Sequence, residues 1–158
     1  MKKRVNKKGQ AYLIASLIII SMIIAFATVS NYSNRTGYVK IYNLEYDYRI
    51  ETEKIVDYSL INGVDSKSLI RNFTKDFSIY SGEDIIIYTI FGQGYDTENI
   101  RAYQYTNGVE TYLNFDISSE NIIVGVDGVD YKFKLISGEN FYYIISQKRG
   151  DEKYVITG

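Results

Sequence analysis

An uncharged apolar stretch near the start of the chain constrains the fold more than any other feature of the sequence. Residues 11–30 contain no Asp, Glu, Lys or Arg and consist mainly of Ile, Leu, Ala and Ser. Twenty helical residues, at about 1.5 Å each, span roughly the 30 Å hydrocarbon core of a bilayer. The sequence therefore predicts a membrane-crossing helix, which we place at residues 10–30.

Positive charge is concentrated on one side of this stretch. Five of the first nine residues are Lys or Arg, and the first acidic residue is Glu45. Basic residues that flank a membrane helix favour the cytoplasmic side. We therefore predict a single-pass protein of the cell membrane, with a cytoplasmic N-terminus and an extracellular C-terminal domain.

The rest of the chain is acidic and lacks two residue types common in catalytic sites. Without the five basic residues of the leader, 13 basic residues face 19 acidic ones, a net charge of -6. This balance argues against nucleic acid as a partner. The absence of Cys and His removes thiolate and imidazole metal ligands and the commonest general base. We predict no enzymatic activity, no cofactor and no metal.

Three interpretations of the first thirty residues are open. A secretory signal would be cleaved after Ala27, because Ala25 and Ala27 form a small-x-small site. An uncleaved anchor requires only the length and the flanking charge. The third interpretation uses the triplet Lys8-Gly9-Gln10, because a glycine lets an extended backbone enter a protease cleft at low cost.

Lys8-Gly9-Gln10, followed directly by an apolar helix, resembles the class III signal peptide of archaeal type IV pilin-like proteins. The resemblance implies that a prepilin-type peptidase recognises Lys8 and Gly9 and leaves Gln10 as the new N-terminus. It covers about the first thirty residues. The fifth position after cleavage is Ile14, where assembling pilins commonly carry a glutamate. The resemblance thus implies processing and anchoring, and leaves homo- or hetero-pilin assembly open.

The pattern of the later residues predicts a small α+β domain outside the cell. We divide the chain into a basic leader (1–9), a transmembrane or pilin-type helix (10–30), an extracellular stalk or helix (31–62) and an α+β domain (63–158). Residues 42–50 alternate as a strand does, but an apolar stripe at helical spacing favours a helix over residues 38–62. Its members are Ile41, Leu44, Tyr48, Ile55 and Tyr58.

Turn signals place the remaining elements. Asp65 or Ser66 caps a second helix that ends near Gly82, and residues 85–91 form a buried strand. Asn107-Gly108 and Asp127-Gly128 each join two strands as a hairpin. Residues 137–140 then turn the chain into a strand at 141–146, and residues 153–157 add an edge. The predicted fold class is α+β: an N-terminal transmembrane helix, one or two further helices, then an antiparallel β-meander.

Several smaller motifs have both a functional and a purely structural interpretation. Asn31, Asn34 and Asn72 begin N-glycosylation acceptor triplets, which also arise by chance in a chain rich in Asn, Ser and Thr. Residues 92–94 are predicted to form a loop and residues 149–151 a solvated hairpin turn. A further set of tyrosines would either be exposed for contact with sugars or partners, or pack within the sheet. These are Tyr103, Tyr105, Tyr142 and Tyr143.

The sequence favours a structural function over a catalytic one. The leading hypothesis is a pilin-like, single-pass cell-surface protein that displays its α+β domain, with the membrane and a prepilin-type peptidase as partners. The alternative is a tethered or secreted module that binds a carbohydrate or an envelope protein.

Overall fold

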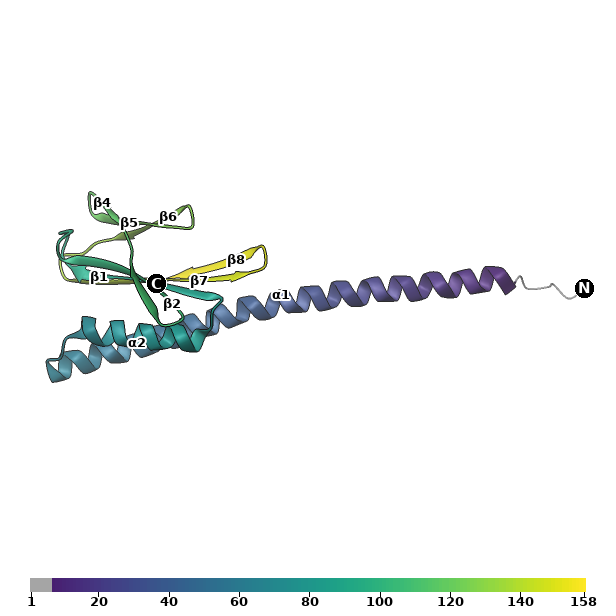
Figure 1. Cartoon of the computed structure of the whole chain (residues 1–158), viewed down its shortest axis with the longest axis horizontal. Helices are drawn as coiled ribbons and strands as arrows, with labels where there is room; N and C mark the ends of the chain where they lie inside the picture. The colour runs from purple at the N-terminus through teal and green to yellow at the C-terminus, as the bar shows by residue number, and fades with distance from the viewer. Residues whose placement is uncertain (1–6) are drawn as a thin grey trace, which may run out of the picture. The chain divides into compact units, whose positions relative to one another are not determined.

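The structure is a computed structural model that describes residues 7–158, with side chains described for residues 19–24 and 40–158. Contacts divide the chain into two units, Met1–Val39 and Lys40–Gly158. Two helices, α1 (Lys7–Asn62) and α2 (Ser66–Ser81), precede eight strands (Figure 1). The α+β class with an antiparallel sheet is therefore confirmed.

The N-terminal part of α1 is described mainly by its backbone. Five large apolar side chains within residues 19–24 are each exposed over more than half of their surface: Ile19, Ile20, Met22, Ile23 and Ile24. Within the described residues, no helix combines the length and the apolar character that crossing a membrane requires. Most side chains of residues 10–30 lie outside this description, so the transmembrane helix stays a prediction.

The helix predicted over residues 38–62 is present as the C-terminal part of α1 rather than as a separate helix. Its buried residues recur every three, four or seven positions, as a helix requires and a strand does not: Ile41, Leu44, Tyr48, Thr52 and Ser59. Ion pairs at helical spacing join Glu45 to Arg49 at 3.5 Å and Glu51 to Lys54 at 2.7 Å. Tyr58, expected on the buried stripe, is instead 57% exposed.

A capped turn separates the two helices. Gly63, at φ +64°, ends α1 in a conformation that favours glycine. Asp65 has an extended backbone and accepts hydrogen bonds from the Lys67 and Ser68 amides, both at 3.2 Å. The hydroxyl of Ser68 donates a further bond to this carboxylate, and these bonds hold the pKa of Asp65 below its usual value. The predicted cap is therefore Asp65, not Ser66.

The strands form two antiparallel sheets. The larger has the order β3-β2-β1-β7-β8, and the smaller has the order β4-β5-β6. The bounds are β1 Ile85–Gln93, β2 Ile100–Thr106, β3 Val109–Tyr112, β4 Asp116–Ser118, β5 Asn121–Val126, β6 Val129–Lys134, β7 Glu139–Arg149 and β8 Glu152–Thr157.

Local turn chemistry sets the hairpins, and long-range pairing sets the centre of the sheet. Asn107-Gly108 and Asp127-Gly128 both have the positive φ values of the predicted hairpin turns. Residues 149–151 form the turn between β7 and β8. β7 follows β6 in the chain but pairs with β1, with Ile87 opposite Ile145. β1 and β7 are thus neighbours at the middle of the larger sheet.

The loop predicted at residues 92–94 is wrong for Gly92 and Gln93, which end β1, while Gly94 lies in the turn that follows. A Cβ atom on Gly92 would lie 2.4 Å from the backbone oxygen of Asn99. Only glycine allows β1 to approach the start of β2 this closely.

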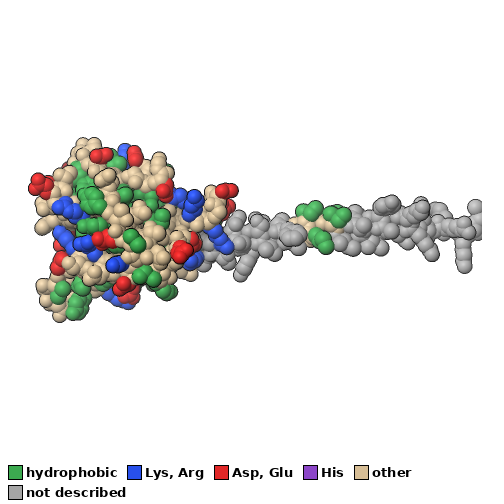
Figure 2. Space-filling model, viewed as in Figure 1, with side chains coloured by type: hydrophobic (Ala, Val, Ile, Leu, Met, Phe, Trp, Pro, Cys, Tyr) green, Lys and Arg blue, Asp and Glu red, His purple; other side chains and the backbone are tan. Residues whose placement is uncertain are grey.

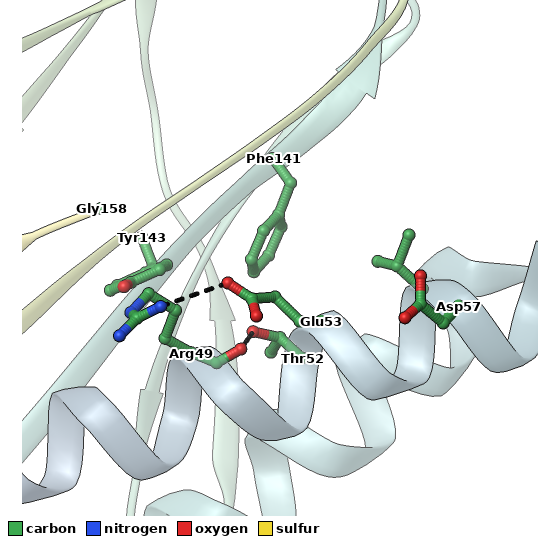
Figure 3. Close-up of a pocket in the computed structure, with 8 residues that line it drawn as sticks. Arg49, Thr52, Glu53, Asp57, Phe141, Tyr143 and Gly158 are labelled. Carbon is green, nitrogen blue, oxygen red and sulfur yellow. Dashed lines mark hydrogen bonds and ion pairs between the residues drawn. The ribbon is translucent and has the colours of Figure 1, made fainter.

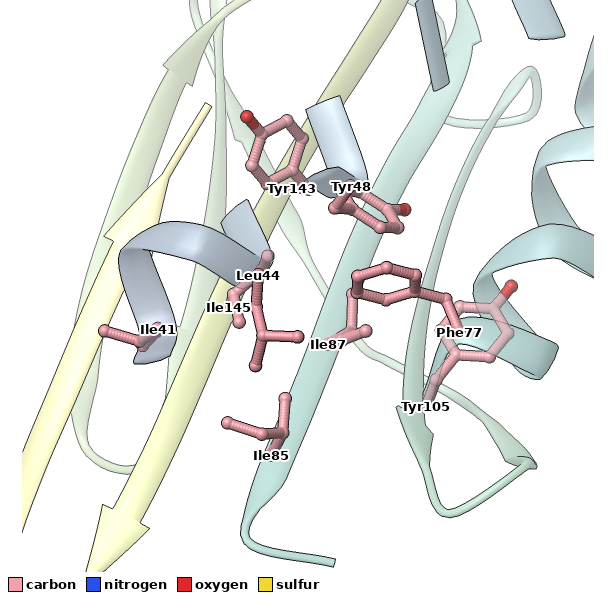
Figure 4. Packing of buried hydrophobic residues seen from close by; sticks show 9 residues of the cluster. All are labelled: Ile41, Leu44, Tyr48, Phe77, Ile85, Ile87, Tyr105, Tyr143 and Ile145. Atoms are coloured by element: carbon pink, nitrogen blue, oxygen red, sulfur yellow. The ribbon is translucent and has the colours of Figure 1, made fainter. Parts of the chain in front are cut away.

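Two cores lie on opposite faces of the larger sheet: a helix-side core, beneath α1 and α2, and a sheet-side core, beneath β4–β6. Ile85 and Ile87 of β1 face the helices, where they pack with Tyr48 of α1 and Phe77 of α2 (Figure 4). The alternate residues of β1, such as Ile90, pack instead with β4–β6. Figure 1 shows the helices on one side of the five-stranded sheet and β4–β6 on the other. Because β1 is covered on both faces, its sequence is almost continuously apolar.

Candidate functional site

The predicted processing residues lie at the start of α1. The backbone of Lys8, Gly9 and Gln10 is helical, but their side chains lie outside the described part of the chain. The same holds for Asn31 and Asn34. These assignments stay predictions.

Asn72, the third predicted glycosylation residue, is exposed on α2, but the threonine of its triplet is not. Thr74 is fully buried, donates a hydrogen bond to the Ile70 carbonyl at 2.8 Å and contacts the Tyr48 hydroxyl at 2.8 Å. In the folded domain the asparagine is therefore accessible, but the threonine that completes the glycosylation triplet is not. A glycan on Asn72 would have to be attached before the domain folds.

A groove of about 300 Å³ lies between the later turns of α1 and strand β7 (Figure 3). Thr52 and Val56 are four positions apart and therefore lie on the same side of the helix. Phe141 and Tyr143 are two positions apart and lie on one face of β7. The complete lining is Arg49, Thr52, Glu53, Val56, Asp57, Phe141, Tyr143 and Gly158. The groove is mainly apolar, with charged groups along its helical rim.

The charges at the rim are largely satisfied within the domain. Arg49 lies 3.5 Å from Glu45 and 3.3 Å from Glu53. Tyr143 donates a hydrogen bond of 2.6 Å to the Glu45 carboxylate. Burial, and then this bond, raises the pKa of Tyr143, so its hydroxyl stays protonated near neutral pH. The groove can hold an apolar group against Phe141 and Val56, beside the charged helical rim.

A second polar cluster joins α2 to the β2–β3 hairpin. Arg71 makes a bidentate contact with Glu110, at 2.5 and 3.1 Å, and Tyr105 donates to the same carboxylate at 2.8 Å. The Arg71 guanidinium also lies 4.7 Å from the centre of the Tyr103 ring. The hydrogen bonds from Arg71 hold the pKa of Glu110 below its usual value, although burial opposes this. The cluster positions α2 against the sheet.

The four tyrosines named as candidate contact residues mostly pack within the domain. Tyr105 and Tyr143 are buried, and Tyr103 and Tyr142 are half-buried. The expectation of exposure is wrong for Tyr105 and Tyr143, and the prediction that such residues pack in the sheet is confirmed. Their carboxylate acceptors, Glu110 and Glu45, could not be predicted from the sequence, because no local pattern pairs a strand tyrosine with a glutamate on another element.

Apolar side chains are also exposed at the two ends of α2. Near the α1–α2 turn, Leu60 and Ile61 are 73% and 83% exposed. At the opposite end of α2, Ile79 and Tyr80 are 55% and 74% exposed. Figure 2 shows apolar side chains gathered on the surface near the α1–α2 turn, at the lower left. Exposed apolar clusters of this kind mark interaction surfaces more often than isolated ones do.

The described residues hold no group of three or more carboxylates placed to bind a metal ion. No protein-family model matches the chain, and searches of curated proteins and of solved structures find no similar protein.

Proposed function

We propose that this chain is a pilin-like, single-pass cell-surface protein with a structural or assembly role. The N-terminal part of α1 anchors it in the cell membrane, and the α+β domain is displayed outside the cell. No catalytic activity belongs to this proposal.

One observation about α1 carries the proposal. Its exposed apolar side chains at residues 19–24 point in several directions around the helix, because successive helical residues are 100° apart. A helix that is apolar on all sides belongs in an apolar surrounding. In the same unbroken helix, Ile41, Leu44 and Tyr48 belong to the domain core. One element thus supplies both a membrane anchor and the scaffold of the displayed domain.

Processing at Gly9 fits the start of this helix. α1 begins at Lys7, so the bond between Gly9 and Gln10 lies in its first turns. A peptidase must unwind that turn, and glycine makes a helix less stable than alanine does, by about 1 kcal/mol. We infer that a prepilin-type peptidase recognises Lys8 and Gly9 and that Gln10 begins the mature chain.

The mature N-terminus, measured by terminal-peptide mass spectrometry on membrane and medium fractions, tests the proposal. We expect a start at Gln10 in the membrane fraction and an uncleaved leader in Gly9→Val. Gly37→Val, which changes a second glycine of α1, is the matched control and should be processed normally. A start at Thr28 in the medium would exclude the proposal. An intact leader on the membrane-bound protein would exclude processing at Gly9 and leave an uncleaved membrane anchor.

The groove between α1 and β7 favours a second candidate function, a tethered module that binds a carbohydrate or an envelope protein. Phe141 and Tyr143 give the groove an aromatic wall of the kind that contacts sugars and proteins. Binding of purified envelope polysaccharide should be lost in Phe141→Ala and retained in Tyr112→Ala, which changes an exposed ring on β3. Equal binding by both variants would exclude the groove as the site.

A further inference from the structure

An exposed stripe of α1 contains acidic residues, and an exposed stripe of α2 contains a basic residue. Each stripe also has two exposed apolar side chains. We call Glu53, Asp57, Leu60 and Ile61 the α1 stripe, and Lys75, Ile79 and Tyr80 the α2 stripe. Members of each stripe are mostly three or four positions apart, so they share one side of their helix. The apolar pair of the α1 stripe lies near the α1–α2 turn, whereas the apolar pair of the α2 stripe lies at the opposite, C-terminal end of α2.

The α1 stripe has a free acidic group next to its apolar residues. Asp57 makes no hydrogen bond or ion pair among the described residues, whereas Glu53 is paired with Arg49. Leu60 and Ile61 follow Asp57 by three and four positions and are the most exposed apolar side chains of α1 in the domain. The stripe therefore offers an unpaired carboxylate one helical turn before an exposed apolar pair.

The α2 stripe repeats this arrangement with a basic residue. Among the residues that the structure describes, the ammonium group of Lys75 makes no hydrogen bond or ion pair, although its charge helps to lower the pKa of Glu110. The neighbouring Asp76 is also exposed, so the basic character of this surface comes from α2 as a whole. Ile79 and Tyr80 follow it by four and five positions and are both mostly exposed. By helical rise, this pair lies about 20 Å along α2 from the α1–α2 turn. It is thus separate from the α1 stripe of the same molecule.

The charges of the two helices reinforce this complementarity. Residues 40–62 of α1 contain five acidic and three basic residues, whereas α2 contains three basic residues and one acidic residue. Two α1 surfaces would therefore repel each other, and so would two α2 surfaces, while an α1 surface attracts an α2 surface. If the helices run parallel, Asp57 lies opposite Lys75 and the two apolar pairs meet.

We propose that the α1 stripe of one copy of this chain docks on the α2 stripe of a second copy. The contact is heterologous, because each copy contributes a different surface and keeps one surface of each kind free. Such contacts extend into a row of copies or close into a ring. This inference rests on the proposed assembly role, because it names the partner of the displayed domain as another copy of the same chain.

The absence of cysteine from the chain allows a direct crosslinking test. Full-length Ile61→Cys and Ile79→Cys variants, each in detergent micelles, are oxidised separately and as a mixture. We expect disulfide-linked dimers in the mixture, about tenfold fewer in either variant alone, and longer ladders from the double variant. Ile61→Cys mixed with Ile136→Cys, an exposed residue elsewhere, is the matched control and should not crosslink. Dominant Ile61→Cys homodimers, or no crosslinks in the mixture, would overturn the proposal.

Charge reversal tests the same contact without cysteine. Asp57→Lys and Lys75→Asp should each weaken self-association about tenfold, which corresponds to about 1.4 kcal/mol. The double variant should regain it, because each contact then joins a lysine to an aspartate again. Failure of the double variant to recover, while both single variants remain folded, would contradict the pairing. Glu51→Lys, on a different side of α1, should have little effect.

A glycan provides an independent check. Asn72 lies one helical turn before Lys75, so a glycan there would cover the α2 stripe. Native assemblies should therefore yield bare Asn72 peptides in mass spectrometry, and full occupancy of Asn72 within an assembly would exclude the contact.

The outcomes separate this contact from the proposed function. Processing at Gly9 and surface display without the mixed crosslink would remove the contact and leave the pilin-like function standing. Release into the medium from Thr28 would remove that function, although the mixed crosslink would still form between the released domains.

Discussion

The two cores of the five-stranded sheet differ in the interactions that attach the layer above each face, which is α1 and α2 on one side and β4–β6 on the other. The helix-side core contains Tyr48, Tyr105 and Tyr143, and each hydroxyl is hydrogen-bonded to Thr74, Glu110 or Glu45, respectively. The sheet-side core is mainly aliphatic, with residues such as Ile90, Ile122 and Val124. Hydrogen bonds are directional, whereas apolar contact is not. On the helix side, tyrosine hydroxyls thus join α1 to α2 and β7 to α1. The second sheet is held mainly by apolar contact, with a hydrogen bond from Tyr142 to the Lys134 carbonyl and an ion pair between Lys153 and Asp127 at its edge.

Truncation of a buried side chain should have the largest effect in either core. Ile144 and Ile145 are neighbours on β7, are both fully buried, and belong to the sheet-side and helix-side cores, respectively. Ile144→Ala and Ile145→Ala should each lower the free energy of unfolding by about 2–5 kcal/mol. Urea unfolding of the full chain in detergent measures both. A cost below about 1 kcal/mol for either variant would mean that its layer does not share a cooperative unit with the sheet.

Loss of a single hydroxyl should distinguish the cores more sharply. Tyr48→Phe removes the bond to Thr74 and should lower the free energy of unfolding by about 0.5–1.5 kcal/mol. Tyr88 lies in the sheet-side core, and no side-chain hydrogen bond joins it to the other described residues. Tyr88→Phe should therefore cost less than about 0.5 kcal/mol. Equal costs would show that the tyrosine hydroxyls do not hold the helices.

Protonation of Glu110 at acid pH should lower the free energy of unfolding, and this effect should be the smallest of the three. Arg71 holds the pKa of Glu110 below its ordinary value of 4.5, so the ionised group stabilises the domain above that pH. This contribution is lost as pH falls through the lowered pKa of the folded state. Glu110→Gln should cost up to about 1 kcal/mol at pH 7, because the pair is partly exposed.

The measurement is the urea midpoint of the Glu110→Gln variant and of the unaltered chain between pH 7 and pH 3. The difference between them should shrink towards acid. Glu120→Gln, on a largely exposed carboxylate, is the control and should follow the unaltered chain. A constant difference across the range would contradict the assigned role of Arg71.

Local physical signals in the sequence predicted much of this fold. The two hairpins follow from Asn-Gly and Asp-Gly turns that need positive φ, and α2 follows from its cap and its apolar face. The pairing of β1 with β7 does not follow, because a strand buried on both faces reveals that it is central but not which strand lies beside it. The bond from Tyr143 to Glu45 joins residues 98 positions apart and has no local signature.

The candidate sites also divide into those predicted from the local sequence and those that only the tertiary structure reveals. The assignment of Lys8, Gly9 and Gln10 as processing residues stays a prediction, made from the resemblance of the first thirty residues to a class III signal peptide and without any tertiary contact. The groove combines a turn of α1 with β7, and the two stripes depend on which apolar helix residues the sheet leaves uncovered. Both require the tertiary arrangement, since Leu60 and Ile61 resemble core residues in the sequence but lie exposed in the fold.

The pairing of β1 with β7 also orders events during synthesis. Residues 85–93 must wait for residues 139–147 before the centre of the larger sheet can close. Contacts between segments far apart in the chain form slowly, because a long loop must be closed first. A nascent chain that has emerged only as far as β6 thus still lacks the strand that completes the sheet. In a protein whose later residues cross a membrane, this delay would keep the chain unfolded, and so able to be threaded, until export is nearly complete.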